Sequence, residues 1–191
     1  MDLSVIVPIR AGGDPVMTLD SLRDQQVSME IILVWDRWDN ANKARNHGWG
    51  LARAPFLLFC DDDIRWKPGA LRHMLQTLKD RPEAYVYGAY CLGDKYIQCN
   101  RNWDEKYLFR ENYISTMSII RSECFPGFDP ELKRLQDWDL WLTMLQQGHT
   151  GVYCDMLVFD TAIRDGITNG GIASYREARA RLQEKHTALC V

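Results

Sequence analysis

The chain has 191 residues, of which 46% are hydrophobic and 26% are charged. This composition is ordinary for a globular protein, so the disordered and collagen-like classes are excluded. The net charge of -3 leaves no basic excess for holding a nucleic-acid backbone. No apolar run reaches the roughly 18 residues of a membrane-spanning helix. We therefore predict one domain over residues 1–191, with no nucleic-acid partner and no transmembrane segment.

The six cysteines are scattered, and no two of them form a C-x-x-C pair. Their spacing indicates neither a zinc site nor a disulfide framework. The four histidines also lack ligand spacing, and we interpret them as surface residues. The N-terminus has no basic region leading into a signal-like apolar segment. Reduced thiols and the absence of a signal favour a cytoplasmic location.

The first 80 residues alternate between strand-like and helix-like segments. Short apolar runs predict strands, and apolar residues at helical spacing predict helices. The predicted strands are Leu3–Pro8, Ile31–Val34 and Phe56–Cys60, and the predicted helices are Val16–Gln25, Asn42–Ala54 and Pro68–Lys79. This alternation indicates a parallel sheet with right-handed crossovers and helices on both faces.

The second half is less regular. We predict strands at Ala84–Cys91, Tyr113–Ile120 and Val152–Phe159, and helices at Leu135–Gln147 and Ser174–Ala188. The intervening segment 93–112 is polar and aromatic.

In parallel α/β sheets, ligands bind beyond the carboxyl ends of the strands. The residues that follow the first three predicted strands are therefore the candidates for a site. They are Pro8 to Arg10, Asp36, and Asp61 to Asp63.

Three consecutive carboxylates, Asp61, Asp62 and Asp63, follow the third predicted strand. A divalent cation would relieve their mutual repulsion, and carboxylate oxygens suit Mg²⁺ or Mn²⁺. Alternate residues of an extended segment share a face, so Asp61 and Asp63 should point together and Asp62 elsewhere. The alternative is a solvated acidic loop.

Two other polar residues lie close to these strands in the sequence. Asp36 offers acceptors to a base or ribose, or it is a turn residue or helix cap. Arg45, on the helix before the third strand, is a candidate to pair with a diphosphate. It is equally a candidate to pair with Asp36 or with the acidic triplet.

Asp137 and Asp139 open the helix predicted at 135–147. Helical residues two apart point about 200° apart, so both cannot face one pocket. One is then a candidate base and the other is solvated, or both are first-turn acids favoured by the helix dipole. Asp165, beyond the last strand, would complete a metal shell or belong to an ordinary turn.

Taken in order, these segments resemble the inverting glycosyltransferases of family 2, which have the GT-A fold. The resemblance covers roughly residues 3–165. Trp35 stands where the family usually has the first of two aspartates, and Gln136 stands where it usually has glutamate. The matching segments are Leu3–Pro8, Ile32–Asp36, Ala44–Gly48, Phe56–Asp63 with its D-x-D motif, Pro68–Leu71, Gly127–Asp129 and Gln136–Leu142.

The resemblance implies an α/β fold with a Rossmann-like, mostly parallel central sheet, helices on both faces and a smaller antiparallel acceptor-side part. Residues 1–92 would form the nucleotide-sugar-binding half, and 93–191 the acceptor and catalytic half. It also implies roles for single residues. Asp137 would be the general base, and Asp63, Asp61 and Asp165 would be near the metal, with Asp165 where the family often has histidine. The nucleotide-sugar pocket would be lined by Pro8, Arg10, Asp36, Arg45, Asp61 and Asp62.

The implied reaction is a transfer with inversion that depends on Mn²⁺ or Mg²⁺. The donor would be a nucleotide-diphosphate sugar, with UDP suggested by the family. The acceptor hydroxyl would belong to a saccharide, a lipid-linked glycan or a protein, and segment 93–112 is our candidate for contacts with it. Two alternatives stay open. One is a nucleotide-sugar-binding module without transfer, and the other is a sugar nucleotidyltransferase, for which Ile9 to Gly13 is a poor version of the required loop.

Overall fold

The computed structural model describes residues 1–93, 96–161 and 171–187. The strands are β1 (Leu3–Ile9), β2 (Met29–Trp35), β3 (Phe56–Phe59), β4 (Ile64–Trp66), β5 (Tyr85–Leu92), β6 (Tyr96–Gln98), β7 (Ile119–Arg121) and β8 (Gly151–Thr161). The helices are α1 (Val16–Arg23), α2 (Ala41–Trp49), α3 (Ala70–Lys79), α4 (Glu105–Arg110), α5 (Gln136–Gln146) and α6 (Gly171–Lys185), with a 3-10 turn at Ser122–Cys124.

Within these residues the strands form one eight-stranded sheet in the order β2-β1-β3-β7-β5-β8-β4, with β6 beside β5. The long ladders are parallel: β1 pairs with β2 on one side and β3 on the other, and β5 pairs with β8. The short ladders made by β7, β4 and β6 are antiparallel. The predicted α/β class, with a mostly parallel sheet and a smaller antiparallel part, is confirmed.

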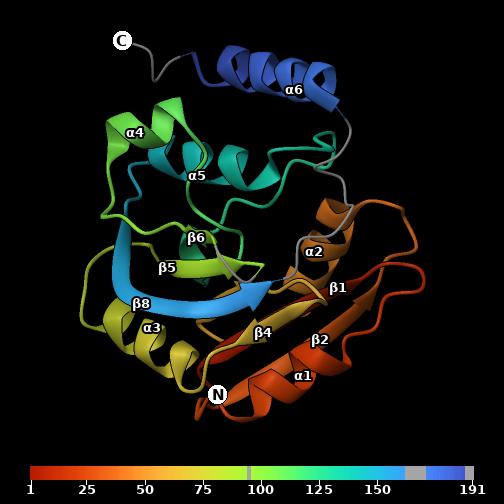
Figure 1. Ribbon diagram of the computed structural model, residues 1–191, viewed down its shortest axis with the longest axis vertical. Helices are drawn as coiled ribbons and strands as arrows, with labels where there is room; N and C mark the ends of the chain where they lie inside the picture. The colour runs from red at the N-terminus through yellow and green to blue at the C-terminus, as the bar shows by residue number, and fades with distance from the viewer. Residues whose placement is uncertain (94–95, 162–170, 188–191) are drawn as a thin grey trace.

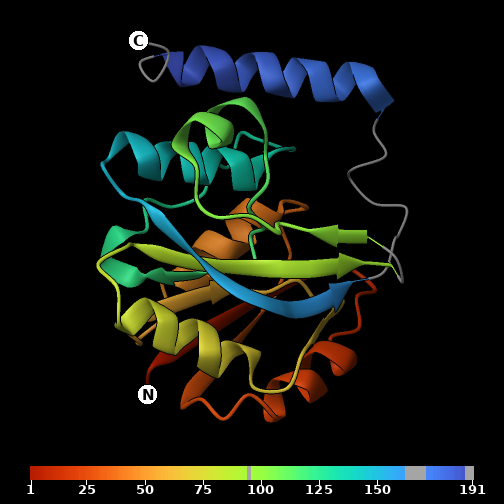
Figure 2. The ribbon, with the colours of Figure 1, turned by 60° about the vertical axis from the view of Figure 1, so that its left-hand side comes forward.

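Helices cover both faces of this sheet (Figures 1 and 2). Alternate side chains of a strand point to opposite faces, so β1 serves two cores. Leu3, Val5 and Val7 pack in the core that also contains residues of α1 and α3. Ile6 packs in the other core, with residues of α2, α4 and α5. Helix α6 lies outside α4 and α5 (Figure 2).

The sequence-based elements of the second half needed correction. The strand predicted from Tyr113 begins only at Ile119. In the segment before it, Ser118 Oγ donates to the Ser115 carbonyl at 2.7 Å, and Ser115 Oγ accepts from the Met117 amide at 3.2 Å. Such local side-chain bonds compete with a sheet ladder, and they leave this segment irregular.

Three short elements were not predicted, namely β4, β6 and α4. Each has three to six residues, which is too short for hydrophobic periodicity to reveal. Helix α4 does carry a start signal. Asp104 is its N-cap and accepts a 2.9 Å hydrogen bond from the Tyr107 amide.

The described cysteines agree with the prediction of reduced thiols. All five of them, Cys60, Cys91, Cys99, Cys124 and Cys154, are free. Across the described ranges, no helix has the length and apolar character needed to cross a membrane.

Candidate active site

The strand register places the ends of β1, β2 and β3 at one edge of the sheet. Ile9 is opposite Trp35 in the β1–β2 ladder. On the other side of β1, the Cys60 amide donates to the Ile6 carbonyl at 2.9 Å. Arg10, Asp36 and Asp61, which follow these strands, therefore emerge at the same edge, as the sequence predicted.

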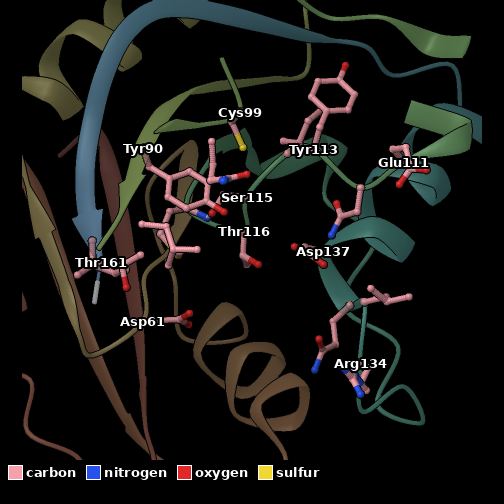
Figure 3. A pocket seen from close by; sticks show the side chains of 18 of the residues that line it. Asp61, Tyr90, Cys99, Glu111, Tyr113, Ser115, Thr116, Arg134, Asp137 and Thr161 are labelled. Carbon is pink, nitrogen blue, oxygen red and sulfur yellow. The ribbon is translucent and has the colours of Figure 1, made fainter. Parts of the chain in front are cut away.

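A cleft of about 900 Å³ opens next to this edge. Its walls come from the β3–β4 connection, residues 97–101, residues 111–117 and the start of α5. Asp61, Asp63, Arg45 and Asp137 all line it. Figure 3 shows Asp61 and Asp137 on different walls of this cleft. Residues far apart in the sequence thus share one cavity, which has room for a small-molecule ligand.

Arg45 is the partner of the first aspartate of the triplet. Its Nη2 donates to Asp61 Oδ1 at 2.8 Å, and its Nη1 donates to Asn42 Oδ1 at 3.3 Å. The Arg45 side chain is only 9% exposed, whereas that of Asp61 is 39% exposed. Arg45 is therefore built into the floor beneath Asp61. Of the alternatives for Arg45, the structure shows the pairing with the acidic triplet.

Asp62 points away from the cleft, toward the turn after β1. A Cβ atom on Gly13 would lie 2.2 Å from Asp62 Oδ2, so a larger residue there would displace the Asp62 carboxylate. This carboxylate oxygen is buried without a hydrogen-bond partner. Burial raises the Asp62 pKa, and the charges of Asp63 and Asp61 raise it further, against the lowering effect of Arg10. Asp61 and Asp63 line the cleft and Asp62 does not, as predicted, but Asp62 and Asp63 lie in a turn and not in the extended segment that the prediction assumed.

The acidic pair at the cleft fits a divalent metal only in part. Among residues 1–93, 96–161 and 171–187, no three acidic, histidine or cysteine side chains form a metal-binding group. Mg²⁺ commonly binds one or two carboxylates and takes its other ligands from substrate phosphates and water. Asp61 and Asp63 therefore suit an ion shared with a diphosphate. Asp165, the third predicted ligand, lies outside the described residues.

Asp36 is held by its own turn. Its Oδ1 accepts from the Trp38 amide at 2.9 Å, and its Oδ2 accepts from the Asn40 amide at 2.8 Å. These bonds shape the turn into α2, where Asn40 is the N-cap. Asp36 therefore shapes this turn, and its carboxylate oxygens have lone pairs left to accept further hydrogen bonds. Pro8, Arg10 and Asp36 lie at the strand ends but are not among the residues that line the cleft.

Asp137 lies in the first turn of α5, facing the cleft. Burial raises the pKa of Asp137. Two hydrogen bonds, from the Asn112 side chain and from the Trp138 amide, act in the opposite direction, as does the positive charge of Arg45. The Trp138 amide donates to Asp137 Oδ1 at 2.9 Å. A carboxylate with a raised pKa at a cavity wall is a suitable proton acceptor.

Helix α5 begins with backbone strain. Leu135 has φ 59° and ψ 30°, in the left-handed region that bulky residues avoid. Leu135 also lines the cleft. Strain of this kind persists only where the surrounding structure holds it, and it is concentrated at functional sites.

Asp139 was expected to be solvated if Asp137 faced a pocket, and this expectation was wrong. Asp139 is 3% exposed. It accepts from Lys185 Nζ at 2.9 Å, and its Oδ1 lies 2.8 Å from His186 Nε2. His186 is 1% exposed, so its assignment to the surface was also wrong. The prediction that the two aspartates face different directions is confirmed, since Asp139 faces α6 while Asp137 faces the cleft.

The sequence analysis did not single out several of the residues that line the cleft. Asn112, Tyr113, Thr116, Arg134 and Tyr175 line the cleft and come from segments without a sharp motif. Asn112 lies at the end of the segment that the sequence favoured for acceptor contacts. Only the folded chain shows that this amide bonds the Asp137 carboxylate.

Comparisons with known proteins agree with this arrangement. The chain is similar in structure to S. aureus TarS, with a TM-score of 0.73 and 14% identity over 97% of this chain and 39% of that one. It is also similar to TarS 1–349 in complex with UDP-GlcNAc, with a TM-score of 0.74 and 15% identity over 100% of this chain and 72% of that one. For TarS 1–349 in complex with UDP, the TM-score is 0.71 and the identity 17%, over 97% and 65% of the two chains.

The chain thus spans well under half of the longer TarS structure. At these identities the likeness shows the fold. Comparison with curated protein sequences gave no significant match. The sequence profile of glycosyl transferase family 2 matches residues 28–129, which include β2, α2, β3 and the acidic triplet. The profile covers more than half of the chain and the structural neighbours share its fold, so this protein belongs to glycosyl transferase family 2.

Proposed function

We propose that this glycosyltransferase moves a sugar from a UDP-sugar to an acceptor hydroxyl, with inversion, and that Asp137 is the general base. The observation that carries the proposal is the cleft itself. It brings the Asp61 and Asp63 carboxylates, on the donor side, into the same cavity as Asp137. UDP is chosen because structures similar to this chain hold UDP-GlcNAc and UDP.

The donor side would lie at the ends of β1, β2 and β3, within residues 1–92. Pro8, Arg10 and Asp36 emerge there, and they would contact the base and ribose. Asp61 would also contact the donor, and Arg45 would hold Asp61 in place through its 2.8 Å bond. Asp62 would act through the turn after β1, which it supports beside Gly13.

A divalent ion, Mn²⁺ or Mg²⁺, would be held by Asp63 and Asp61, with Asp165 as a further proposed ligand. When bound, such an ion offsets the negative charge that develops on the leaving diphosphate. The protein's own part is to keep two carboxylates on the cleft side of the β3–β4 connection. The Arg45 charge beneath them limits their mutual repulsion.

The acceptor side would lie within residues 93–191. In the transfer step, Asp137 takes the proton of the acceptor hydroxyl, and that oxygen forms a bond to the anomeric carbon. The bond from the anomeric carbon to the diphosphate oxygen breaks, and its electron pair leaves with the diphosphate. Attack from the face opposite the leaving group inverts the configuration.

The test combines UDP binding with UDP release from UDP-GlcNAc. We expect Mn²⁺ to tighten UDP binding in calorimetry, and we expect Asp63→Asn to lose this effect. Asp137→Asn should keep Mn²⁺-dependent UDP binding and lose UDP release by about 10²–10⁴-fold, the usual contribution of a general base. Asp20→Asn, at an exposed position of α1, is the matched control.

Two results would overturn parts of this proposal separately. If UDP does not bind with or without Mn²⁺, the donor is not a uridine nucleotide. If Asp137→Asn releases UDP at the wild-type rate, another group is the base.

A further inference from the structure

One wall of the cleft carries a guanidinium group stacked on tyrosine rings. The Arg101 Cζ atom lies 3.5 Å from the ring centroid of Tyr107 and 5.5 Å from that of Tyr113. All three residues line the cleft. A cation on an aromatic face is attracted by the ring quadrupole, so the two rings fix the position of the guanidinium.

The backbone that carries Arg101 is tied to the sheet. The hydroxyl of Tyr87, a buried residue of β5, donates to the Arg101 carbonyl at 3.0 Å. The hydroxyl of Tyr153, in β8, donates to Asn100 Oδ1 at 2.8 Å. The Arg101 amide donates to the Cys99 carbonyl at 3.0 Å. Arg101 is therefore presented to the cleft on an anchored segment.

Across the described parts of the chain, no carboxylate forms an ion pair with Arg101. The acid closest in sequence, Asp104, caps α4 through its bond to the Tyr107 amide. By contrast, Arg45 is occupied by Asp61 at 2.8 Å. Stacking uses the face of a guanidinium and leaves the N–H donors around its edge available for an anion.

Tyr113, one of the two rings that hold Arg101, lies on the same side of the cleft as the proposed base. Tyr113 directly follows Asn112, whose side chain bonds Asp137. In Figure 3, Tyr113 lies on the opposite side of the view from Asp61. An anion on Arg101 would therefore belong to the acceptor rather than to the diphosphate of the donor.

We propose that Arg101, held by Tyr107 and Tyr113, is a subsite for an acidic acceptor, a saccharide that carries a carboxylate or phosphate group. The inference rests on the proposed function, because Asp137 defines the acceptor side. A planar guanidinium binds either anion through two parallel hydrogen bonds, which also orients the acceptor. A neutral acceptor would leave this charge unpaired.

The test uses three ligands that share one ring: glucose, glucuronate and glucose 6-phosphate. Each is titrated into the full chain with and without saturating UDP and Mn²⁺. We expect at least one anionic ligand to bind about ten-fold or more tightly than glucose, the strength of a charge-assisted hydrogen bond. The carboxylate and phosphate arms show which anion is preferred.

The variants separate this subsite from non-specific charge effects. Arg101→Gln should remove the preference for the anion, Arg101→Lys should keep part of it, and Arg23→Gln on α1 should keep all of it. Equal affinities for the three ligands, no binding of any of them, or a preference that survives in Arg101→Gln would each overturn the proposal. UDP binding is measured in the same samples, so a loss of UDP binding with the preference intact would count against the proposed function alone.

Discussion

At the scale of single residues, the chemistry of the site depends on how the protein treats its carboxylates. Asp61 is paired with Arg45, Asp62 is half-buried with one carboxylate oxygen enclosed beside a turn, and Asp137 is partly enclosed at the cleft wall. Burial disfavours the charged form of a carboxylate, whereas a neighbouring cation favours it. In the proposed function the same residue type would thus serve as ligand, support and base according to its surroundings.

The raised pKa of Asp137 predicts the pH dependence of the reaction. Asp137 can accept a proton only in its deprotonated, carboxylate form. Activity should therefore fall as the pH drops through the pKa of Asp137, which lies above the ordinary aspartate value of about 3.9. Asn112→Ala removes a hydrogen bond that lowers the pKa, so the acid limb should move to higher pH. The measurement is the pH profile of UDP release from UDP-GlcNAc.

Asn102→Ala, at an exposed position outside the cleft lining, is the control for that profile. An acid limb at the same pH in wild type and Asn112→Ala would contradict the link between Asn112 and the base. A uniform loss of activity without a shift would assign Asn112 a role in structure only.

At the scale of elements, α6 is attached to α5 by a small polar cluster. Lys185 Nζ donates to Asp129 at 2.8 Å and to Asp139 at 2.9 Å, and His186 bridges Asp139 and Gln146. Burial alone would lower the Lys185 pKa, but the hydrogen bonds to both aspartates outweigh it and raise the pKa. These contacts connect the C-terminal helix to the helix that carries Asp137.

Asp139→Asn should weaken this attachment. The substitution removes the charge that faces Lys185, and we expect a loss of about 1–3 kcal/mol of stability. The loss is smaller than for a fully buried pair because the Lys185 side chain is 38% exposed. Urea denaturation measures it, with Asp20→Asn in the exposed pair on α1 as the control. Equal midpoints for the two variants would show that the cluster contributes nothing.

At the scale of the whole molecule, both cores share one sheet, and the cleft lies along its edge beside α5. A ligand that fills the cleft would contact the first half of the chain at Asp61 and the second half at Asp137. Binding to the folded state alone therefore stabilises the whole structure.

UDP with Mn²⁺ at about 100 times Kd should raise the thermal midpoint by about 5–10 °C for a chain of this size. The measurement is calorimetric unfolding with and without ligand. Asp63→Asn should show no additional rise from Mn²⁺ in the presence of UDP. A midpoint that does not respond to UDP in the wild type would argue against the donor site.

Much of the first half was predictable from local pattern. The apolar runs of β1, β2 and β3 are each bounded by turn residues, and a parallel sheet places their carboxyl ends together. The separation of Asp62 from Asp61 and Asp63 was also predicted, although the structure produces it through a turn and not through an extended segment. These inferences needed only the periods of strands and helices, which are local properties of a sequence.

The tertiary structure decided the rest. No local signal places Lys185 and His186 against Asp139, because the contact joins residues more than 45 positions apart. For Arg45 the sequence left three partners open, and the fold selected Asp61. No local signal indicated that a tyrosine of the sheet anchors the segment of Arg101. Sequence determines which segments form strands and which charges follow them. The partner of a charge, and so its ionisation and role, depends on which distant segments pack together.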